Sequence, residues 1–250
     1  MSIVYPEEEL FNKEGDIPYL KKIAEILEPL NPQMVNTYKG KSLDPLSKGF
    51  DFPMAKGSVR VYQTEKIGKI LIVNFLIMES IATVNCGAYP KDDYDFPVLL
   101  SERNVYLDKG IVQIHSDFAP LADLSLNWDY AERYHKPLEE IYKKYREVPG
   151  VRSHEYPWFS ALCSPYIVAG KIEKEHRQEI FECQITYLKT YVDMVQRAEP
   201  QKDPQKKEYA LRKKMAIPRN VVTNSPDMRA MERMFGKERA DLFFHIFQSF

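Results

Sequence analysis

The chain has 250 residues, which is enough for one large domain with a hydrophobic core. Its formal net charge of -1 argues against a nucleic-acid partner, and its 44% hydrophobic and 28% charged residues are ordinary for a globular protein. Three cysteines without a CxxC pair argue against an iron–sulfur cluster or a structural zinc site, and they fit a reducing compartment.

The N-terminal part predicts one helix and an irregular linker. Apolar residues recur at helical spacing over 17–28, and Pro29 and Pro32 end this helix. Residues 31–57 contain prolines and glycines at irregular spacing, which is typical of a linker. The first ten residues hold three glutamates and no basic residue, which argues against a signal peptide or a retained transit peptide.

A run of strand-like segments follows the linker. β-branched and aromatic residues dominate these segments, and short polar turns join them. Because such short turns join antiparallel neighbours, we expect an antiparallel sheet. The segments span 59–64, 69–77, 82–89, 97–106 and 111–118.

Helical patterns dominate the rest of the chain. Apolar stripes predict helices over 130–145 and 173–197, with one more strand at 162–172 between them. Residues 199–209 are interpreted as a charged loop, and residues 226–250 as the last helix.

An antiparallel sheet with helices before and after it predicts an α+β fold, arranged as a three-layer α/β/α sandwich with a central antiparallel sheet. Ser225 suits the N-cap of the last helix and Pro226 its first position. No internal repeat is present, so we expect residues 1–250 to form a single domain, with the N-terminal helix and linker in residues 1–56.

Glu102 is the candidate catalytic residue. It follows the apolar segment 96–100, and a carboxylate on an apolar sheet face is costly unless it is neutral, paired or used. A carboxyl group that keeps its proton is what a proton donor needs. The alternative, which spacing alone favours, is that Ser101-Glu102-Arg103 begins a solvated turn.

The segment around Glu102 resembles the ferredoxin-dependent bilin reductases. Tyr89-Pro90 and Asp95-Phe96-Pro97 match their pattern, and the acid falls at Glu102 where this family mostly has Asp. A Glu at this point is more similar to the related red chlorophyll catabolite reductases. Further matches between residues 57 and 250 occur in the same order, at His115 to Pro120, Leu126 to Tyr130, Cys163-Ser164-Pro165 and Ser225 to Gly236.

The resemblance implies reduction of an open-chain tetrapyrrole, either a bilin or a red chlorophyll catabolite, by electrons from reduced ferredoxin. It implies no bound cofactor and no metal. Glu102 would be the proton donor, and Asn85 would hold a pyrrole-lactam oxygen or nitrogen unless it forms a cross-strand polar pair. Asp227 is the only carboxylate at the start of the final helix, the region where the family places a second acid, although stabilisation of the helix N-terminus is the favoured role for it.

Ser225 stands at a position where family members carry an acid. This departure motivates the alternative that the chain is a non-catalytic pigment carrier. Lys171, Arg219 and Arg229 are candidates to pair with pigment propionates, and solvated surface charge is an equal alternative for each.

A basic stretch could steer an acidic ferredoxin towards the protein, although charge runs are usually only solvated faces. We expect a monomer. We expect no membrane partner, because no apolar run reaches the length of a membrane span. We place it in the cytoplasm, or in the plastid stroma if a transit peptide was removed. The basic stretch comprises Lys206, Lys207, Arg212, Lys213 and Lys214.

Overall fold

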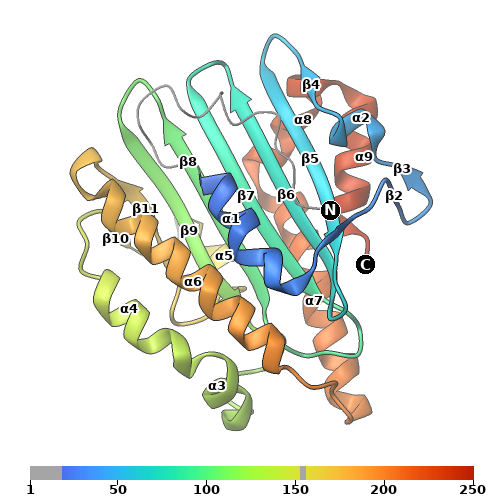
Figure 1. Ribbon diagram of the computed structural model, residues 1–250, viewed down its shortest axis with the longest axis vertical. Helices are drawn as coiled ribbons and strands as arrows, with labels where there is room; N and C mark the ends of the chain where they lie inside the picture. The colour runs from blue at the N-terminus through green and yellow to red at the C-terminus, as the bar shows by residue number, and fades with distance from the viewer. Residues whose placement is uncertain (1–18, 153–155) are drawn as a thin grey trace.

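The computed structural model describes residues 19–152 and 156–250, and its centre is a large antiparallel sheet (Figure 1). Within those residues the sheet has nine strands in the order β1-β5-β6-β7-β8-β9-β11-β10, with β4 paired to β5 at one edge. A separate two-stranded sheet joins β2 and β3. The strands are β1 (Gln33–Met34), β2 (Thr37–Tyr38), β3 (Lys41–Ser42), β4 (Phe50–Asp51), β5 (Ala55–Gln63), β6 (Ile67–Ile77), β7 (Ile81–Pro90), β8 (Val98–Tyr106), β9 (Ile111–Ala119), β10 (Val151–Arg152) and β11 (Val168–Ile172).

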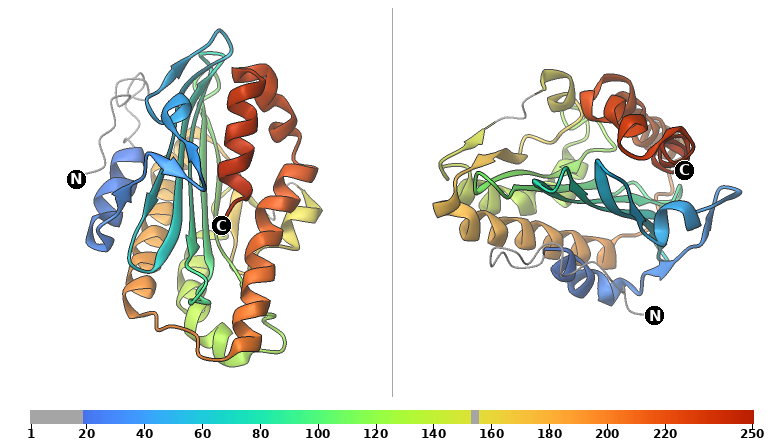
Figure 2. Two further views of the ribbon diagram at one scale, coloured as in Figure 1. Left: turned by 90° about the vertical axis from the view of Figure 1, so that its right-hand side faces the viewer. Right: turned by 90° about the horizontal axis from the view of Figure 1, so that it is seen from above.

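Helices cover both faces of the sheet, which confirms the predicted three-layer α/β/α sandwich (Figure 2). One helical layer contains α1, α3, α4 and α6, and the other contains α5, α7, α8 and α9. The helices are α1 (Tyr19–Leu27), α2 (Asp44–Ser47), α3 (Trp128–Tyr134), α4 (Glu139–Tyr145), α5 (Pro157–Ser160), α6 (Arg177–Arg197), α7 (Pro204–Asn224), α8 (Pro226–Phe235) and α9 (Lys237–Gln248), with 3-10 turns at Glu28–Leu30, Lys136–Leu138 and Lys174–His176.

The hydrophobic core is divided by the sheet. The apolar faces of α1 and α6 pack against one side of the central strands, around Leu99, Val105 and Phe118. On the other side, α8 and α9 pack against β5 and β6 around Val59 and Phe75. Burying apolar side chains on both faces is the main favourable term that holds the three layers together.

Two of the predicted helical boundaries were wrong. The last helix is divided into α8 and α9 at Gly236, whose φ of 81° lies in the left-handed region that glycine adopts without strain. The charged segment 199–209 is not all loop, because α7 begins at Pro204. Asp203 caps α7 by accepting hydrogen bonds from the backbone N–H groups of Gln205 and Lys206, and proline is compatible with the first helical position.

Two other elements also differ from the prediction. The expected strand at 162–172 is limited to β11 (Val168–Ile172). The expected helix at 130–145 is divided into α3, a 3-10 turn that contains Pro137, and α4. Proline cannot donate the backbone hydrogen bond that would continue α3, so the chain turns there.

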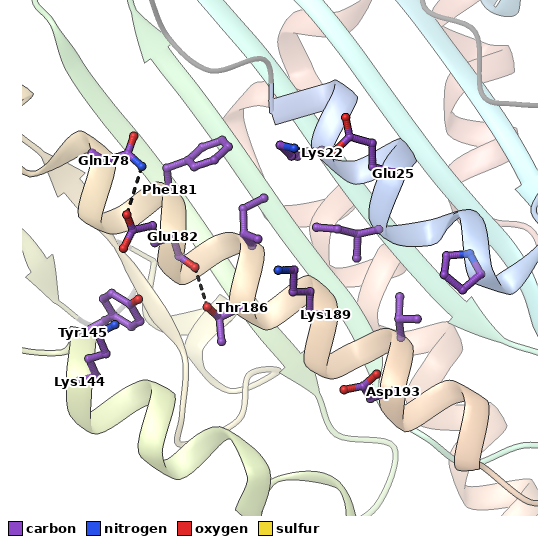
Figure 3. A pocket seen from close by; sticks show the side chains of 14 residues that line it. Lys22, Glu25, Lys144, Tyr145, Gln178, Phe181, Glu182, Thr186, Lys189 and Asp193 are labelled. Atoms are coloured by element: carbon purple, nitrogen blue, oxygen red, sulfur yellow. Dashed lines mark hydrogen bonds and ion pairs between the residues drawn. The ribbon is translucent and has the colours of Figure 1, made fainter.

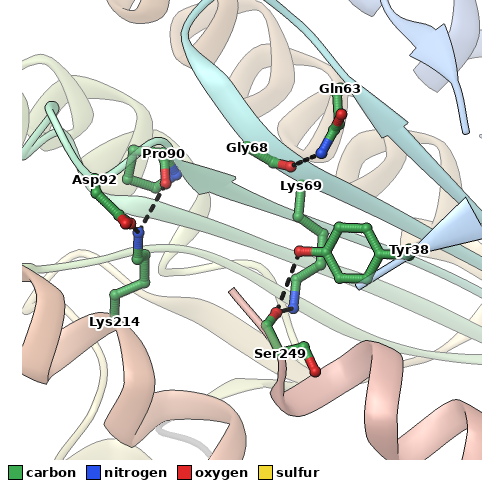
Figure 4. A network of polar contacts seen from close by, with 8 residues as sticks. All are labelled: Tyr38, Gln63, Gly68, Lys69, Pro90, Asp92, Lys214 and Ser249. Carbon is green, nitrogen blue, oxygen red and sulfur yellow. Dashed lines mark hydrogen bonds and ion pairs between the residues drawn. The ribbon is translucent and has the colours of Figure 1, made fainter. Parts of the chain in front are cut away.

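Lys69 of β6 binds the C-terminal end of α9 and so links this helix to the sheet (Figure 4). Its side chain is buried, and Nζ donates hydrogen bonds to the carbonyl oxygens of Ile246, Phe247 and Ser249 at 2.9 to 3.0 Å. Lysine at a helix C-terminus bonds carbonyl groups that have no partner inside the helix. The centroid of the Phe250 ring lies 4.0 Å from the same Nζ. Among the described helices, none is both long and apolar enough to cross a membrane.

Candidate functional site

Asn85, Glu102 and His115 form one row across the sheet. Asn85 of β7 is the register partner of Glu102 of β8, and Glu102 is the partner of His115 of β9. Side chains directly opposite one another on neighbouring strands point to the same face. Val73 of β6 and Ala169 of β11 continue the row at either end. The structure therefore brings the predicted proton donor and Asn85 together, and it resolves which way His115 faces.

This face of the sheet carries α5 and the C-terminal helices. Leu100, two residues before Glu102 and therefore on the same face, packs in a cluster with Tyr89, Ile217 of α7 and Phe250. From Leu100 onward, every second residue of β8 is partly exposed, although β8 is a central strand with neighbours on both sides. The helical layer thus leaves this part of the face accessible, so a ligand can reach Glu102.

Glu102 is held in a defined orientation. It lies inside β8, so the alternative of a solvated turn at this position was wrong. The side-chain amide of Asn104 donates a hydrogen bond to Oε1 of Glu102, and Nε2 of Gln184 donates to the backbone carbonyl of Glu102 at 2.9 Å. Asn104 is two residues further along β8, which places its side chain on the same face.

The row also offers hydrogen-bond acceptors. Oδ1 of Asn85 and Oδ1 of Asn104 are buried and have no hydrogen-bond partner among the described residues. A buried polar atom without a partner is costly, so such atoms often mark a place where a ligand binds. Both atoms belong to residues on the face that carries Glu102, and both can accept hydrogen bonds from N–H groups.

A buried polar cluster lies beside the row. Asp117 is two residues beyond His115 on β9 and is fully buried. Ser164 donates two hydrogen bonds to it, from the backbone N–H to Oδ2 at 2.9 Å and from Oγ to Oδ1 at 2.5 Å. The ring of Phe159 in α5 packs edge-on against His115 at 5.0 Å between ring centroids.

The other predicted site residues take different positions. Lys171 of β11 pairs in register with Gln113, which pairs with Asn104, so Lys171 shares the face of Glu102 at an exposed position. Arg219 is exposed on α7, two residues after the buried Ile217.

The remaining predicted site residues lie at the start of α8. Ser225 is buried between α7 and α8, and its backbone N–H donates to the carbonyl of Val221 at 2.9 Å. The side chains of Asp227 and Arg229 lie outside the part of the chain that the structure describes.

Lys214 does not belong to an exposed basic patch, so its assignment to ferredoxin steering was wrong. Its side chain is 3% exposed, and Nζ bonds the carbonyl of Pro90 at 3.0 Å and Oδ1 of Asp92 at 2.5 Å (Figure 4). It lies on the inner face of α7 with Ala210 and Ile217, four residues after the first and three before the second. Lys214 therefore fastens α7 to the turn after β7.

A hollow of about 700 Å³ lies on the opposite side of the molecule, between α1, α4 and α6 (Figure 3). Its lining mixes acidic and basic side chains, among them Glu25, Lys144, Glu182 and Lys189. The sheet separates it from Glu102, because Ser101, the neighbour of Glu102 on the other face, bonds Tyr19 of α1 at 2.6 Å. This hollow is not part of the row.

Comparisons with known proteins agree with this architecture. The sequence model of the family described as ferredoxin-dependent bilin reductase matches residues 56–247. A 15,16-dihydrobiliverdin:ferredoxin oxidoreductase from Nostoc punctiforme is 26% identical over 189 residues, which cover 74% of this chain and 75% of that protein. A crystal structure of phytochromobilin synthase from tomato in complex with biliverdin has a similar fold, with a TM-score of 0.75 at 18% identity over 92% of this chain and 83% of that one.

Proposed function

Since the chain belongs to the ferredoxin-dependent bilin reductase family, we propose that it reduces a biliverdin-type open-chain tetrapyrrole with electrons from reduced ferredoxin. The observation that carries this proposal is the row of Asn85, Glu102 and His115 on a partly exposed face of the central strands. A flat pigment lying against that face meets one carboxyl group and several hydrogen-bonding side chains.

The reaction adds two electrons and two protons to one double bond of the pigment. Two reduced ferredoxins supply the electrons one at a time, and each ferredoxin is oxidised. The protein has to hold the pigment and place a proton on the reacting carbon. Glu102 is the proton donor, and its hydrogen bond from Asn104 fixes the direction in which the carboxyl group points.

Binding follows from the chemistry of the pigment. Pyrrole and lactam rings present N–H donors, and Oδ1 of Asn85 and of Asn104 are acceptors that otherwise stay without a partner in the described part of the chain. The propionate groups are anionic, and Lys171 is an exposed cation on the same face as Glu102. We assign Asn85 and Asn104 to the pigment core and Lys171 to a propionate.

Two alternatives are kept as outcomes of the test. The relative from Nostoc punctiforme is named for 15,16-dihydrobiliverdin, whereas Glu102 and Leu126 to Tyr130 resemble red chlorophyll catabolite reductases. A non-catalytic carrier remains the alternative from another class, because Ser225 stands where relatives carry an acid.

An anaerobic assay separates these possibilities. The purified protein is mixed with biliverdin, 15,16-dihydrobiliverdin or red chlorophyll catabolite, reduced ferredoxin is added, and product absorbance is followed. We expect a bilin to be consumed only when both protein and reduced ferredoxin are present. A pigment that binds but shows no spectral change on reduction would identify a carrier, and consumption of the chlorophyll catabolite alone would correct the substrate.

A further inference from the structure

Asp117 lies beside the row of Asn85, Glu102 and His115, and it is a second acid on the same face of the sheet. It is two residues from His115 along β9 and is the register partner of Leu100, which is two residues from Glu102 along β8. The nearest polar atoms of His115, Asp117 and Cys163 all lie within 4.8 Å of one another. The sequence offers no acid at Ser225, so a second source of protons near the row has a chemical use.

The surroundings of Asp117 keep it in one position and away from solvent. Ser164 donates to both carboxyl oxygens, and the Cys163 thiol lies beside it and donates to the carbonyl of Phe159 at 3.3 Å. The loop after α5 therefore closes over Asp117 while α5 places Phe159 against His115. His115 is therefore a neighbour of both acids, because it is the register partner of Glu102 on β8 and lies two residues from Asp117 along β9.

We infer that Asp117 is a buried proton reservoir that resupplies Glu102 through His115, so that the second proton of each two-electron reduction also leaves the protein from Glu102. This inference rests on the proposed function. After Glu102 gives its proton to the pigment, it is a carboxylate. His115 passes a proton to Glu102 and takes one from Asp117. Glu102 then gives that proton to the pigment, and solvent reprotonates the relay after product release.

The electrostatics of the site support this role. Burial raises the pKa of Asp117 to about 7, and hydrogen bonds from Ser164 and Cys163 oppose the rise. At neutral pH a large share of the molecules therefore carries a proton on this carboxyl group. A reservoir has to hold a proton under the conditions of turnover and release it to a neighbour, and a pKa near the working pH suits both.

The charged and titratable groups around Asp117 come from several elements. Burial raises the pKa of the Cys163 thiol in the loop after α5 and of the Tyr187 hydroxyl in α6, so both are neutral near pH 7. On the sheet face, His115 and Glu102 are the titratable neighbours, and Lys171 lies two residues beyond Ala169, the partner of His115.

The test compares Asp117→Asn with Ser164→Ala. Asparagine keeps the shape and an acceptor for Ser164 but holds no transferable proton. We expect wild-type turnover to fall as the pH rises through about 7, because Asp117 then loses its proton. Asp117→Asn should turn over roughly a hundredfold more slowly below pH 7 and lack this decline. Ser164→Ala removes a hydrogen bond that lowers the pKa of Asp117, so it should move the decline to higher pH.

Single-turnover measurements separate the first proton from the second. With one equivalent of pigment, Asp117→Asn should form the one-electron radical at the wild-type rate and then accumulate it, which electron paramagnetic resonance detects. Asp108→Asn, the same change at an exposed acid in the β8–β9 turn, is the matched control and should behave as wild type.

A wild-type pH profile and no radical accumulation in Asp117→Asn would overturn the relay. Equal loss of pigment binding and turnover in Asp117→Asn, with an unmoved decline in Ser164→Ala, would show a purely structural role and also overturn it. In the Glu102→Gln background, which removes the contribution of Glu102, the infrared band of a protonated carboxyl group, measured without pigment, should be present and should disappear when Asp117→Asn is added. If wild type reduces no tetrapyrrole at all, the proposed function itself is wrong. If wild type reduces one and the pH profiles coincide, only the relay is wrong.

Discussion

The side-chain amide of Asn104 donates a hydrogen bond to Oε1 of Glu102, which lies two residues earlier on the same face of β8. This contact joins the carboxyl group of the candidate site to a rigid strand in the middle of the sheet. The neutral side chain of Asn104 thus helps to set the direction of Glu102, and it can be removed without changing the charge of the site.

Glu102→Gln should retain pigment binding and lower turnover by roughly a hundredfold or more. Glutamine keeps the shape and hydrogen-bonding ability of Glu102 but cannot supply a proton. Pigment affinity is measured by absorbance titration and turnover with reduced ferredoxin. Glu65→Gln, at an exposed position between β5 and β6, is the control. Turnover at the wild-type level in Glu102→Gln would remove Glu102 as the proton donor.

Asn104→Ala should lower kcat by about tenfold, the effect expected for loss of one hydrogen bond to a charged or reacting group. Asn85→Ala should act mainly on pigment affinity, because Oδ1 of Asn85 has no hydrogen-bond partner among the described residues and is assigned to the pigment core. The two variants are compared by their kcat and KM for pigment. If both change only KM, Asn104 binds the pigment and does not orient Glu102.

Ferredoxin docking on α7 should depend on Lys213 and not on Lys214. Lys213→Glu should raise the KM for ferredoxin at low ionic strength, and added salt should reduce the difference from wild type. Lys189→Glu, on α6 in the other helical layer, is the matched control. Equal KM values for Lys213→Glu and Lys189→Glu would place the docking surface elsewhere.

Reversing Lys214 has a different expected effect. Lys214→Glu should lower the free energy of unfolding by about 3 kcal/mol, because it puts an acid beside Asp92 and the carbonyl of Pro90 at a buried position. Lys213→Glu should change it by no more than about 0.5 kcal/mol. Chemical denaturation of both variants measures the difference. Similar stability in the two would contradict the structural role of Lys214.

Stability towards acid should depend on His135. Burial lowers the pKa of His135 to about 4. The hydrogen bond that Nε2 donates to the carbonyl of Phe118 at 2.8 Å has the opposite, smaller effect and raises the pKa. The unfolded chain takes up this proton near pH 6.5, so the contribution of neutral His135 is complete above that pH and is lost as the pH falls towards about 4. The loss amounts to roughly 3 kcal/mol at most.

The measurement compares His135→Gln with wild type by denaturation between pH 4 and 7. Glutamine stays neutral and should flatten the acid-side decline. The raised pKa of Asp117 acts in the opposite direction over this range, since the folded state holds that proton more tightly, but both proteins keep Asp117. Parallel curves for the two proteins would show that His135 is not the group responsible.

The product should be that of a single two-electron reduction. A second reduction needs protons at the other end of the pigment. The resemblance to the family implies an acid at position 225, where this chain has Ser225, which cannot donate a proton at useful pH. Ser225→Asp should change the distribution of products without abolishing activity. The product spectra of wild type, Ser225→Asp and Asp227→Asn decide the matter. A four-electron product from wild type that survives Asp227→Asn would contradict this prediction.

The resemblance of the motifs around Glu102 predicted the family. Alternating β-branched residues and short turns, which are local signals, predicted the five long strands, and helical patterns before and after them predicted the three-layer sandwich. It did not predict the contact between Asp117 and Ser164, which are 47 residues apart. The sequence did carry a signal for Asn104, which was not predicted, and for Lys214, whose predicted role was wrong. The strand period places Asn104 on the face of Glu102, and the helical period places Lys214 on the inner face with Ala210 and Ile217.

The row from Val73 through Asn85, Glu102 and His115 to Ala169 has a consequence for how such proteins diversify. Each of its positions belongs to a different strand, and neighbouring strands lie about 4.8 Å apart. One substitution thus changes the chemistry offered to one stretch of a flat ligand and leaves the backbone of the other strands unchanged. The double bond of the ligand that reacts can then change through single substitutions along the row. Insertion of one residue into β8 would instead turn its side chains to the other face of the sheet and take Glu102 away from the ligand.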